Sequence, residues 1–388
     1  MKMTERECAL LAFDHQETPW VPSPSTSMDI CIPTVIEEGA RGYGITTDWF
    51  GVKYLYREDQ PGPMPLESEV KIDDIENWKE IVTMPNIDDY DWEGHAARDT
   101  ANWDRKNKVS KCILINGCFE SLHMFCGFVD ALCNIQEYED ECKDFMEWIA
   151  NYKVAIIERV KKYYNPDIIQ FHDDYGNTNN MFMPLSKWNT IVRPNLQKVV
   201  DAVKGNDMRF LLHSDGKIRE MIPTFIEMGI EALNPVQTEN NPYEVKQLFG
   251  DRLTINGGFD NVAVLDNPDA TEQDIRDSIN KTLYEMYPGG GWVAHCSFLN
   301  QFSDRNAIWL DCLDNFNQPL MEKAVFLLYD TEIWMSCNPC IILLKTQRGS
   351  YLFINTKETK FQSLEIWSLF FFYPQNVSTR DILLHTTT

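Results

Sequence analysis

The chain has 388 residues, of which 44% are hydrophobic and 24% charged, a composition typical of a globular protein. Its 35 Lys and Arg against 59 Asp and Glu give a net charge of -24, which argues against a nucleic-acid-binding surface and against binding to anionic lipid. The N-terminus is charged and lacks the apolar core of a secretory signal, and no apolar run is long enough to span a membrane. The eleven cysteines are scattered, so we expect reduced thiols and a cytoplasmic protein.

The first hundred residues predict a helix followed by an irregular arm. "TERECALLAFDHQ" is typical of a helix, with Thr4 as its cap and Glu7 at the capping-box spacing, and Pro19 and Pro22 mark a turn after it. Further on, "TTDWFGVKYLYREDQPGPMPLE" alternates like a hairpin, and "DDIENWKEI" resembles a short helix. We therefore interpret residues 1 to about 109 as an N-terminal arm.

From about residue 110, strand-like runs alternate with helical ones. The strand-like runs are "KCILINGC", "PDIIQFHDD", "MRFLLHSD", "IEALNPVQ", "LTINGGFD" and "GWVAHCSF", and a helical segment follows each of them. Repeated strand–helix units predict a parallel sheet, and no dinucleotide-binding glycine fingerprint supports a Rossmann sheet. The fold class is therefore α/β, a (β/α)8 TIM barrel with an N-terminal arm, covering residues 1–316. Its active site should lie at the carboxyl ends of the strands.

The last part of the chain, residues 317–388, breaks this rhythm. It is aromatic and strand-like, and we interpret it as an atypical C-terminal extension that is β-structured or poorly ordered. Its "CNPC" has the spacing of a metal or redox pair, but no second pair and no histidine follow it.

Polar residues follow several of the predicted strands. Because side chains in a strand alternate between its two faces, residues two apart share a face. The rows that share a face are Leu211, His213 and Asp215; Gln170, His172 and Asp174; Asn116, Cys118 and Glu120; and Trp292, Ala294 and Cys296, with His295 on the opposite face. If these rows face the barrel axis, they form a small-molecule site at its mouth.

Each of these residues also has a structural explanation. Asp215 precedes a predicted helix and could cap it, and Asp174 could cap a turn. His213 could be a hydrogen-bonded structural histidine, and Cys296 a small buried apolar residue. Together, however, His, Asp and Cys are a ligand set that zinc accepts.

Six segments resemble the uroporphyrinogen decarboxylase superfamily. They are "MTERECALLAFDHQETPWVP", "ILINGCFESLHMF", "DDYGNT", "LLHSDGKIREMIPTFIEMGIEALNPVQ", "FGDRLTINGGFD" and "GGGWVAHCSF", in the family's order, and the resemblance covers about residues 1–316. It implies a (β/α)8 barrel with one of two main chemistries. Decarboxylases bind a tetrapyrrole through N-terminal arginines without a metal, whereas corrinoid-linked methyltransferases bind zinc through a His-x-Cys and a later Cys. A third group demethylates methoxylated aromatic compounds.

The residues resemble the methyltransferases more closely than the decarboxylases. After "TPWVP" the chain reads "SPSTSMDI", and its first arginine after Arg6 is Arg41, so the cationic anchors for a substrate with several carboxylates are missing there. The family histidine falls on His213 and the last cysteine on Cys296, whereas Asp215 replaces the middle cysteine.

The resemblance therefore implies a methyltransferase that moves a methyl group between a small molecule and a separate corrinoid protein. His213, Asp215 and Cys296 would hold zinc, with His213 and Asp174 as catalytic residues; Asp174 would transfer a proton or replace a ligand. The residues expected to bind substrate are Asn116, Glu120, His172, Asn234 and Gln237. The alternatives are a metal-free tetrapyrrole decarboxylase and a non-catalytic ligand-binding barrel.

Overall fold

A computed structural model describes residues 3–40, 42–58, 62–298, 300–329, 341–345 and 351–355. The chain divides into two compact units, Met1–Leu327 and Leu328–Thr388. In the second unit, β11 (Ile341–Lys345) and β12 (Tyr351–Asn355) pair antiparallel. The "CNPC" motif lies outside the described residues. Within the described part of the chain, no helix combines the length and apolar character needed to cross a bilayer.

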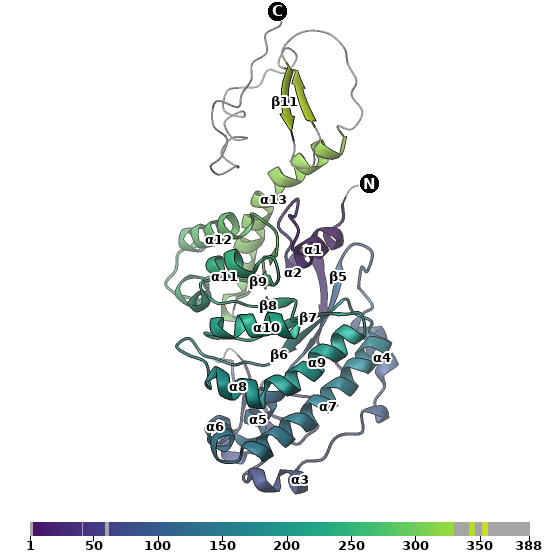
Figure 1. The fold of residues 1–388 in the computed structure, drawn as a ribbon, viewed down its shortest axis with the longest axis vertical. Helices are drawn as coiled ribbons and strands as arrows, with labels where there is room; N and C mark the ends of the chain where they lie inside the picture. Colours follow the sequence, from purple (N-terminus) through teal and green to yellow (C-terminus); the bar gives the residue numbers. More distant parts are fainter. Residues whose placement is uncertain are drawn as a thin grey trace, which may run out of the picture. The chain divides into compact units, whose positions relative to one another are not determined.

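The first unit is built on a parallel sheet that curls, with helices around it (Figure 1). In spatial order its strands are β1 (Met28–Cys31), β5 (Val109–Leu114), β6 (Ile168–His172), β7 (Arg209–His213), β8 (Ala232–Asn234), β9 (Thr254–Asn256) and β10 (Trp292–Val293). This arrangement confirms the predicted α/β, TIM-barrel-like fold. The described residues supply seven strands, one fewer than a complete (β/α)8 barrel has, and the first of them lies in the stretch interpreted as an arm.

Helices follow the strands along the chain. In the first unit they are α1 (Glu5–Phe13), α2 (Pro24–Ser27), α3 (Trp78–Ile81), α4 (Trp92–Asp99), α5 (Cys118–Cys126), α6 (Phe128–Glu137), α7 (Glu139–Tyr163), α8 (Leu185–Ile191), α9 (Arg193–Gly205), α10 (Ile222–Met228), α11 (Pro242–Phe249) and α12 (Glu272–Met286), while α13 (Asn306–Tyr329) runs across the division between the units. The longest of the first unit, α7, lies beside α9 (Figure 1). Its buried Phe145, Ile149, Ile156 and Val160 recur at the spacing that places apolar side chains on one helix face.

The helix α1 closes the amino-terminal end of the sheet. Thr4 and Glu7 form the predicted capping box at its start. Its apolar face joins a separate core cluster, made of Ala9, Ala12, Phe13, Met28, Val109, Ile168, Leu211, Ala232 and Val293. Because these residues include members of β1, β5, β6, β7, β8 and β10, they identify the strand positions that face the inside of the curled sheet. The carboxyl ends of the strands form the opposite edge.

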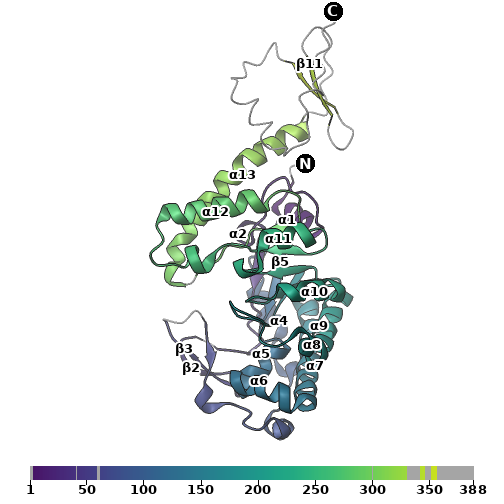
Figure 2. The same cartoon turned by 60° about the vertical axis from the view of Figure 1, so that its left-hand side comes forward.

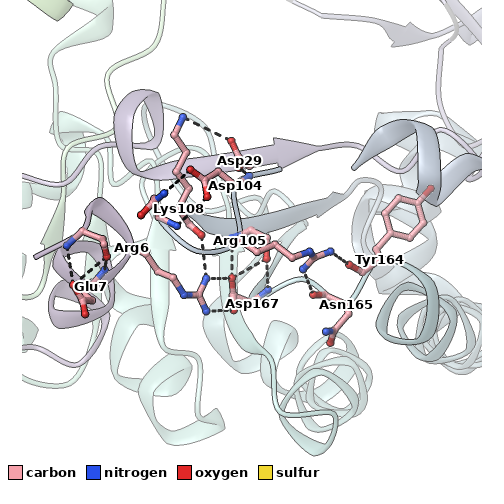
Figure 3. A network of polar contacts seen from close by, with 12 residues as sticks. Arg6, Glu7, Asp29, Asp104, Arg105, Lys108, Tyr164, Asn165 and Asp167 are labelled. Carbon is pink, nitrogen blue, oxygen red and sulfur yellow. Dashed lines mark hydrogen bonds and ion pairs between the residues drawn. The ribbon is translucent and has the colours of Figure 1, made fainter. Parts of the chain in front are cut away.

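A polar network fastens α1 to the start of the strands (Figure 3). Arg6 donates two hydrogen bonds, of 2.5 and 2.6 Å, to the two carboxylate oxygens of Asp167, which also accepts from the Ser110 backbone N–H at 2.8 Å. Arg105 donates to the backbone carbonyls of Tyr164 and Asn165. A bidentate arginine–carboxylate pair is geometrically specific, so this network fixes the end of the barrel away from the site.

The predicted hairpin is confirmed. β2 (Gly44–Thr47) pairs antiparallel with β3 (Lys53–Tyr56), and β4 (Met64–Pro65) adds a third strand (Figure 2). The short helix predicted in "DDIENWKEI" is present as a 3-10 turn, Ile75–Asn77, followed by α3.

Candidate functional site

Three side chains that can bind a metal converge at the carboxyl ends of β6 and β7. Asp174 follows β6, His213 ends β7, and Asp215 lies two residues further on. His213 Nε2 lies 3.9 Å from an oxygen of each carboxylate, and one candidate ligand atom from each residue lies within 4.8 Å of the others. The group is only partly buried, since the side chains of Asp174, His213 and Asp215 are 31%, 18% and 46% exposed. It is therefore within reach of a solute.

Asn234, at the end of β8, orients the imidazole of His213. Its Nδ2 donates to the backbone carbonyl of Asn256 at 2.8 Å, which directs its Oδ1 toward His213 Nδ1, 2.7 Å away. An amide oxygen only accepts, so His213 Nδ1 must carry the proton. Nε2, the other ring nitrogen, faces Asp174 and Asp215. A hydrogen bond that fixes the tautomer of a histidine in this way is the usual support of a metal-binding imidazole.

The tight turn in "HSDG" depends on its glycine. Gly216 has φ +87°, and a Cβ at this position would lie 2.2 Å from the carbonyl carbon of Gly176. The loops after β6 and β7 can approach this closely only because residue 216 lacks a side chain. Asp215 does not cap a helix: the next helical turn is the 3-10 segment Arg219–Met221, and no side chain caps it. The capping explanation for Asp215 is thereby excluded.

Asp174 is held against the neighbouring loop in a carboxylate-rich environment. Its Oδ1 accepts the backbone N–H of Asp215 at 2.8 Å. Burial, helped by the charge of Asp215, raises the pKa of Asp174, whereas His213 opposes that rise. Glu120 also lies nearby, and burial together with the charges of Asp174 and Asp173 raises its pKa well above its ordinary value. The site thus concentrates carboxylates.

Asp173 points to the opposite side of β6 from His172. It accepts from the backbone N–H groups of Phe119 and Glu120 in the first turn of α5, at 3.3 and 2.8 Å, and from the Tyr175 hydroxyl at 2.7 Å. Its burial raises its pKa to about 7 despite these donors. We interpret Asp173 as the residue that ties α5 to the loop carrying Asp174.

Beneath the group formed by Asp174, His213 and Asp215 lies a buried polar array. Lys111 donates to Gln170 Oε1 at 2.5 Å, so Gln170 Nε2 donates to His172 Nε2 at 2.8 Å. The His172 ring stacks on that of His213, with centroids 3.8 Å apart and planes at 9°. On the far side, Asn234 Nδ2 lies 2.6 Å from His295 Nδ1. Burial, reinforced by the charges of His213 and Lys111, lowers the pKa of His172 well below its ordinary value and that of His295 to about 3.

The structure does not bring Cys296 to this group. Val293 belongs to the inward-facing cluster, so His295 faces inward, whereas Trp292, Ala294 and Cys296 belong to the outer core. Cys296 is buried, and its charged or thiol neighbours there are Asp266 and Cys312. The sequence interpretation assigned the two faces of this segment the wrong way round. Cys296 fits the description of a small buried apolar residue, and Asp174 is the third residue beside His213 and Asp215 that could bind a metal.

The residues expected to bind substrate contact other parts of the protein in the structure. Asn234 and His172 support His213, and Gln237 Oε1 accepts the Gly216 N–H at 2.6 Å, which steadies the "HSDG" turn. Asn116, at φ +55°, donates to the Tyr54 hydroxyl at 3.4 Å. Glu120 lies in α5 rather than in a strand, because β5 ends at Leu114 and α5 begins at Cys118. Strand alternation therefore did not apply to Asn116, Cys118 and Glu120.

A cleft of about 650 Å³ lies among the loops that carry Asp174 and Asp215. One side of it is apolar and the other polar or charged, and it is lined by Asn180, Met181, Phe182, Met183, Pro184, Leu185, Lys217, Arg219, Glu220 and Glu239. Lys217 is two residues from Asp215, and its backbone N–H is bonded to the Asn177 carbonyl at 2.8 Å. A cleft of this size and lining suits a small molecule.

Sequence reasoning missed Lys111 and the inward direction of His295. Lys111 was overlooked because a lysine at the edge of a predicted strand is normally exposed. The segment "GWVAHC" is apolar on both faces, so only its neighbours reveal its direction. Trp292 packs against Phe259 in the outer core, between the sheet and the helices. This bulky side chain was the signal in the sequence that could have shown which face of the segment points outward.

Comparisons with known proteins agree with this fold. The structure is similar to that of a methyltransferase from Methanosarcina mazei, with a TM-score of 0.60 and 11% sequence identity over 81% of this chain and 99% of that chain. At this identity the likeness shows the fold. No curated protein matches the chain. The family model described as "Uroporphyrinogen decarboxylase (URO-D)" matches residues 47–298, which is more than half of the sequence. The chain therefore belongs to the uroporphyrinogen decarboxylase (URO-D) family.

Proposed function

We propose that this protein is a methyltransferase that uses a divalent metal, zinc, held by Asp174, His213 and Asp215. The observation that carries the proposal is the orientation of His213, whose Nδ1 is bonded to Asn234 and whose Nε2 faces both carboxylates. One imidazole nitrogen and two carboxylate oxygens fit zinc, and three protein ligands leave a position open for substrate. The proposal replaces Cys296 in the expected ligand set by Asp174.

A zinc ion held there would supply Lewis acidity toward an atom of the substrate that carries or accepts the methyl group. The chain's own residues would do the rest. Asn234 and His172 hold the imidazole in place, and the loop bond between Asp215 and Asp174 keeps the two carboxylates together. Two carboxylates and one imidazole form a harder donor set than a site with two thiolates. We therefore favour a substrate with a methyl-bearing oxygen over a thiol.

The substrate would occupy the cleft beside Lys217, where an apolar wall meets the loop that carries Asp215. The difficult part of the methyl chemistry would belong to a corrinoid, carried by a separate protein. This last element rests on the family resemblance alone.

The charge of the site disfavours a tetrapyrrole with several carboxylates. The partly exposed Asp174 and Asp215 lie together at the mouth of the sheet, and an anionic substrate would meet two acidic side chains there. Arg41, the first arginine after Arg6, lies outside the described residues. Consumption of a porphyrinogen by the metal-free protein would overturn the methyltransferase proposal.

Metal content separates the candidate ligand sets. Wild-type protein should retain zinc after dialysis, while His213→Ala, Asp174→Asn and Asp215→Asn should each lose most of it, measured by elemental analysis. Cys296→Ser is the matched control and should keep its zinc, because Cys296 lies in the outer core. Methyl transfer from a methyl ether to a corrinoid protein should then fail in the three ligand variants alone. Full zinc content in Asp174→Asn with loss in Cys296→Ser would show that the ligand set is wrong.

A further inference from the structure

A second pocket lies at the carboxyl ends of β1 and β5, against α7, and shares no lining residue with the group around His213. Its volume is about 240 Å³. It is lined by Ile32, Thr34, Ile36, Glu38, Ala40, Ile113, Leu114, Ile115, Lys153 and Ile156. Except for three polar residues, this lining is aliphatic and contains no aromatic side chain.

The pocket has an open rim and a buried charged floor. Ile32 is 52% exposed, and Thr34, which is also exposed, uses its hydroxyl outside the pocket with His95 and Asp99. In contrast, the side chains of Glu38 and Lys153 are only 3% and 2% exposed. A solute could therefore enter past Ile32 and reach the two charged groups at the bottom.

The ion pair on this floor is incompletely satisfied. Lys153 donates to Glu38 Oε2 and to the Ile115 carbonyl, the latter at 2.8 Å, which uses two of its three N–H groups. Glu38 Oε1 is buried and accepts no hydrogen bond of ordinary geometry. The Tyr152 hydroxyl, which is also buried without such a bond, is a neighbouring donor, and burial together with Glu38 raises its pKa well above its ordinary value. A buried carboxylate oxygen without a donor is costly, so this atom favours any ligand that brings one.

We propose that this pocket binds a small, uncharged aliphatic alcohol. A hydroxyl group can donate to Glu38 Oε1 and accept from the third N–H of Lys153, which neither a carboxylate nor an ammonium group can do. An anion would meet Glu38 and a cation would meet Lys153, so the pair selects against both charges. A dry cavity of about 150 Å³ holds benzene, so this one accommodates roughly six to ten non-hydrogen atoms. The inference goes beyond the methyltransferase proposal and does not depend on a metal.

Isoleucine methyl groups provide a local test, because five isoleucines line the pocket. The full-length protein, labelled with ¹³C at the isoleucine δ1 methyls, is titrated with 3-methylbutan-1-ol and separately with 3-methylbutanoate. The alcohol should shift the signals of Ile113, Ile115 and Ile156 saturably while leaving Ile168 and Ile255 in place. The carboxylate has the same carbon skeleton, and it should bind at least roughly tenfold more weakly because it lacks a donor for Glu38.

Two variants complete the test. Ala40→Phe places a ring in the pocket and should abolish the shifts, whereas Ala101→Phe, at an exposed position away from the pocket, should leave them unchanged. Equal binding of the carboxylate, shifts spread over all isoleucines, or no shift at all would each overturn the proposal. Binding that appears only in Tyr152→Phe would overturn it too, because the Tyr152 hydroxyl would then satisfy Glu38 in the native protein.

Discussion

The Oδ1 atom of Asn234 lies 2.7 Å from Nδ1 of His213 and thereby determines which imidazole nitrogen faces Asp174 and Asp215. Asn234 is itself buried, with its amide nitrogen bonded to the Asn256 carbonyl and to His295. Its orientation is therefore fixed by the protein and not by the histidine that it supports. If the site holds a metal, this amide controls the affinity without being a ligand.

Asn234→Ala should weaken zinc binding by roughly 10–100-fold, the usual effect of removing a residue that orients a metal ligand. Without the acceptor, His213 can protonate Nε2 instead of Nδ1 and can rotate away from the carboxylates. Competition with a chelating dye measures the affinity. Asn195→Ala, which removes a buried amide from α9, is the control for a general loss of stability. Unchanged zinc affinity in Asn234→Ala would show that His213 does not depend on this bond.

Sequence periodicity was reliable where one face of a strand was polar. In β6 and β7, the rows ending at Asp174 and Asp215 were assigned to the correct face, because Ile169 and Phe171 on the other face could only pack against helices. The same reasoning failed for His295 and Cys296, since apolar residues occupy both faces there. It also failed at Glu120, because nothing in "INGCFE" marks the point where strand geometry ends. The pairing of Asn234 with His213 could not be predicted, since it depends on the neighbouring strand's register.

Gly216→Ala should disrupt the candidate site and the loop around it. The new methyl group would contact the Gly176 backbone, and the positive φ of residue 216 strains any residue with a Cβ, at a cost of roughly 1–3 kcal/mol. Gly205→Ala is the matched control, since a Cβ there meets no atom within 4 Å. Denaturant unfolding should show destabilisation for the first variant and little change or a gain for the second. Equal stability of the two proteins would contradict the close approach of the loops.

The C-terminal boundary of the barrel can be tested with Asn317. The sequence pattern predicts a barrel that ends at residue 316, but Asn317 is buried and exchanges hydrogen bonds of 2.9 and 3.0 Å with the backbone of Val21. We expect a chain ending at residue 327 to unfold in one cooperative transition. Asn317→Ala in that chain should lower the free energy of unfolding by roughly 1–3 kcal/mol, because buried backbone groups lose their partner. Asn315→Ala, at an exposed position of the same helix, provides the matched control, and an equal loss in both variants would argue against a specific role for Asn317.

Lys111 should give the protein an unusual dependence of stability on alkaline pH. The side chain is buried inside the sheet, and burial lowers its pKa from 10.5 to about 8. Between these two pH values the unfolded chain binds more protons than the folded one, so the free energy of unfolding should rise with pH from about 8 to about 10.5. The full effect on the free energy of unfolding is roughly 3 kcal/mol.

Lys111→Met keeps most of the apolar volume and should remove this rise, so the readout is the difference between the pH profiles of the two proteins. Other groups also titrate in this range, but they are common to both proteins and cancel in the difference. Parallel profiles from denaturant unfolding at pH 7.5 to 10.5 would mean that Lys111 keeps its ordinary pKa in the folded protein.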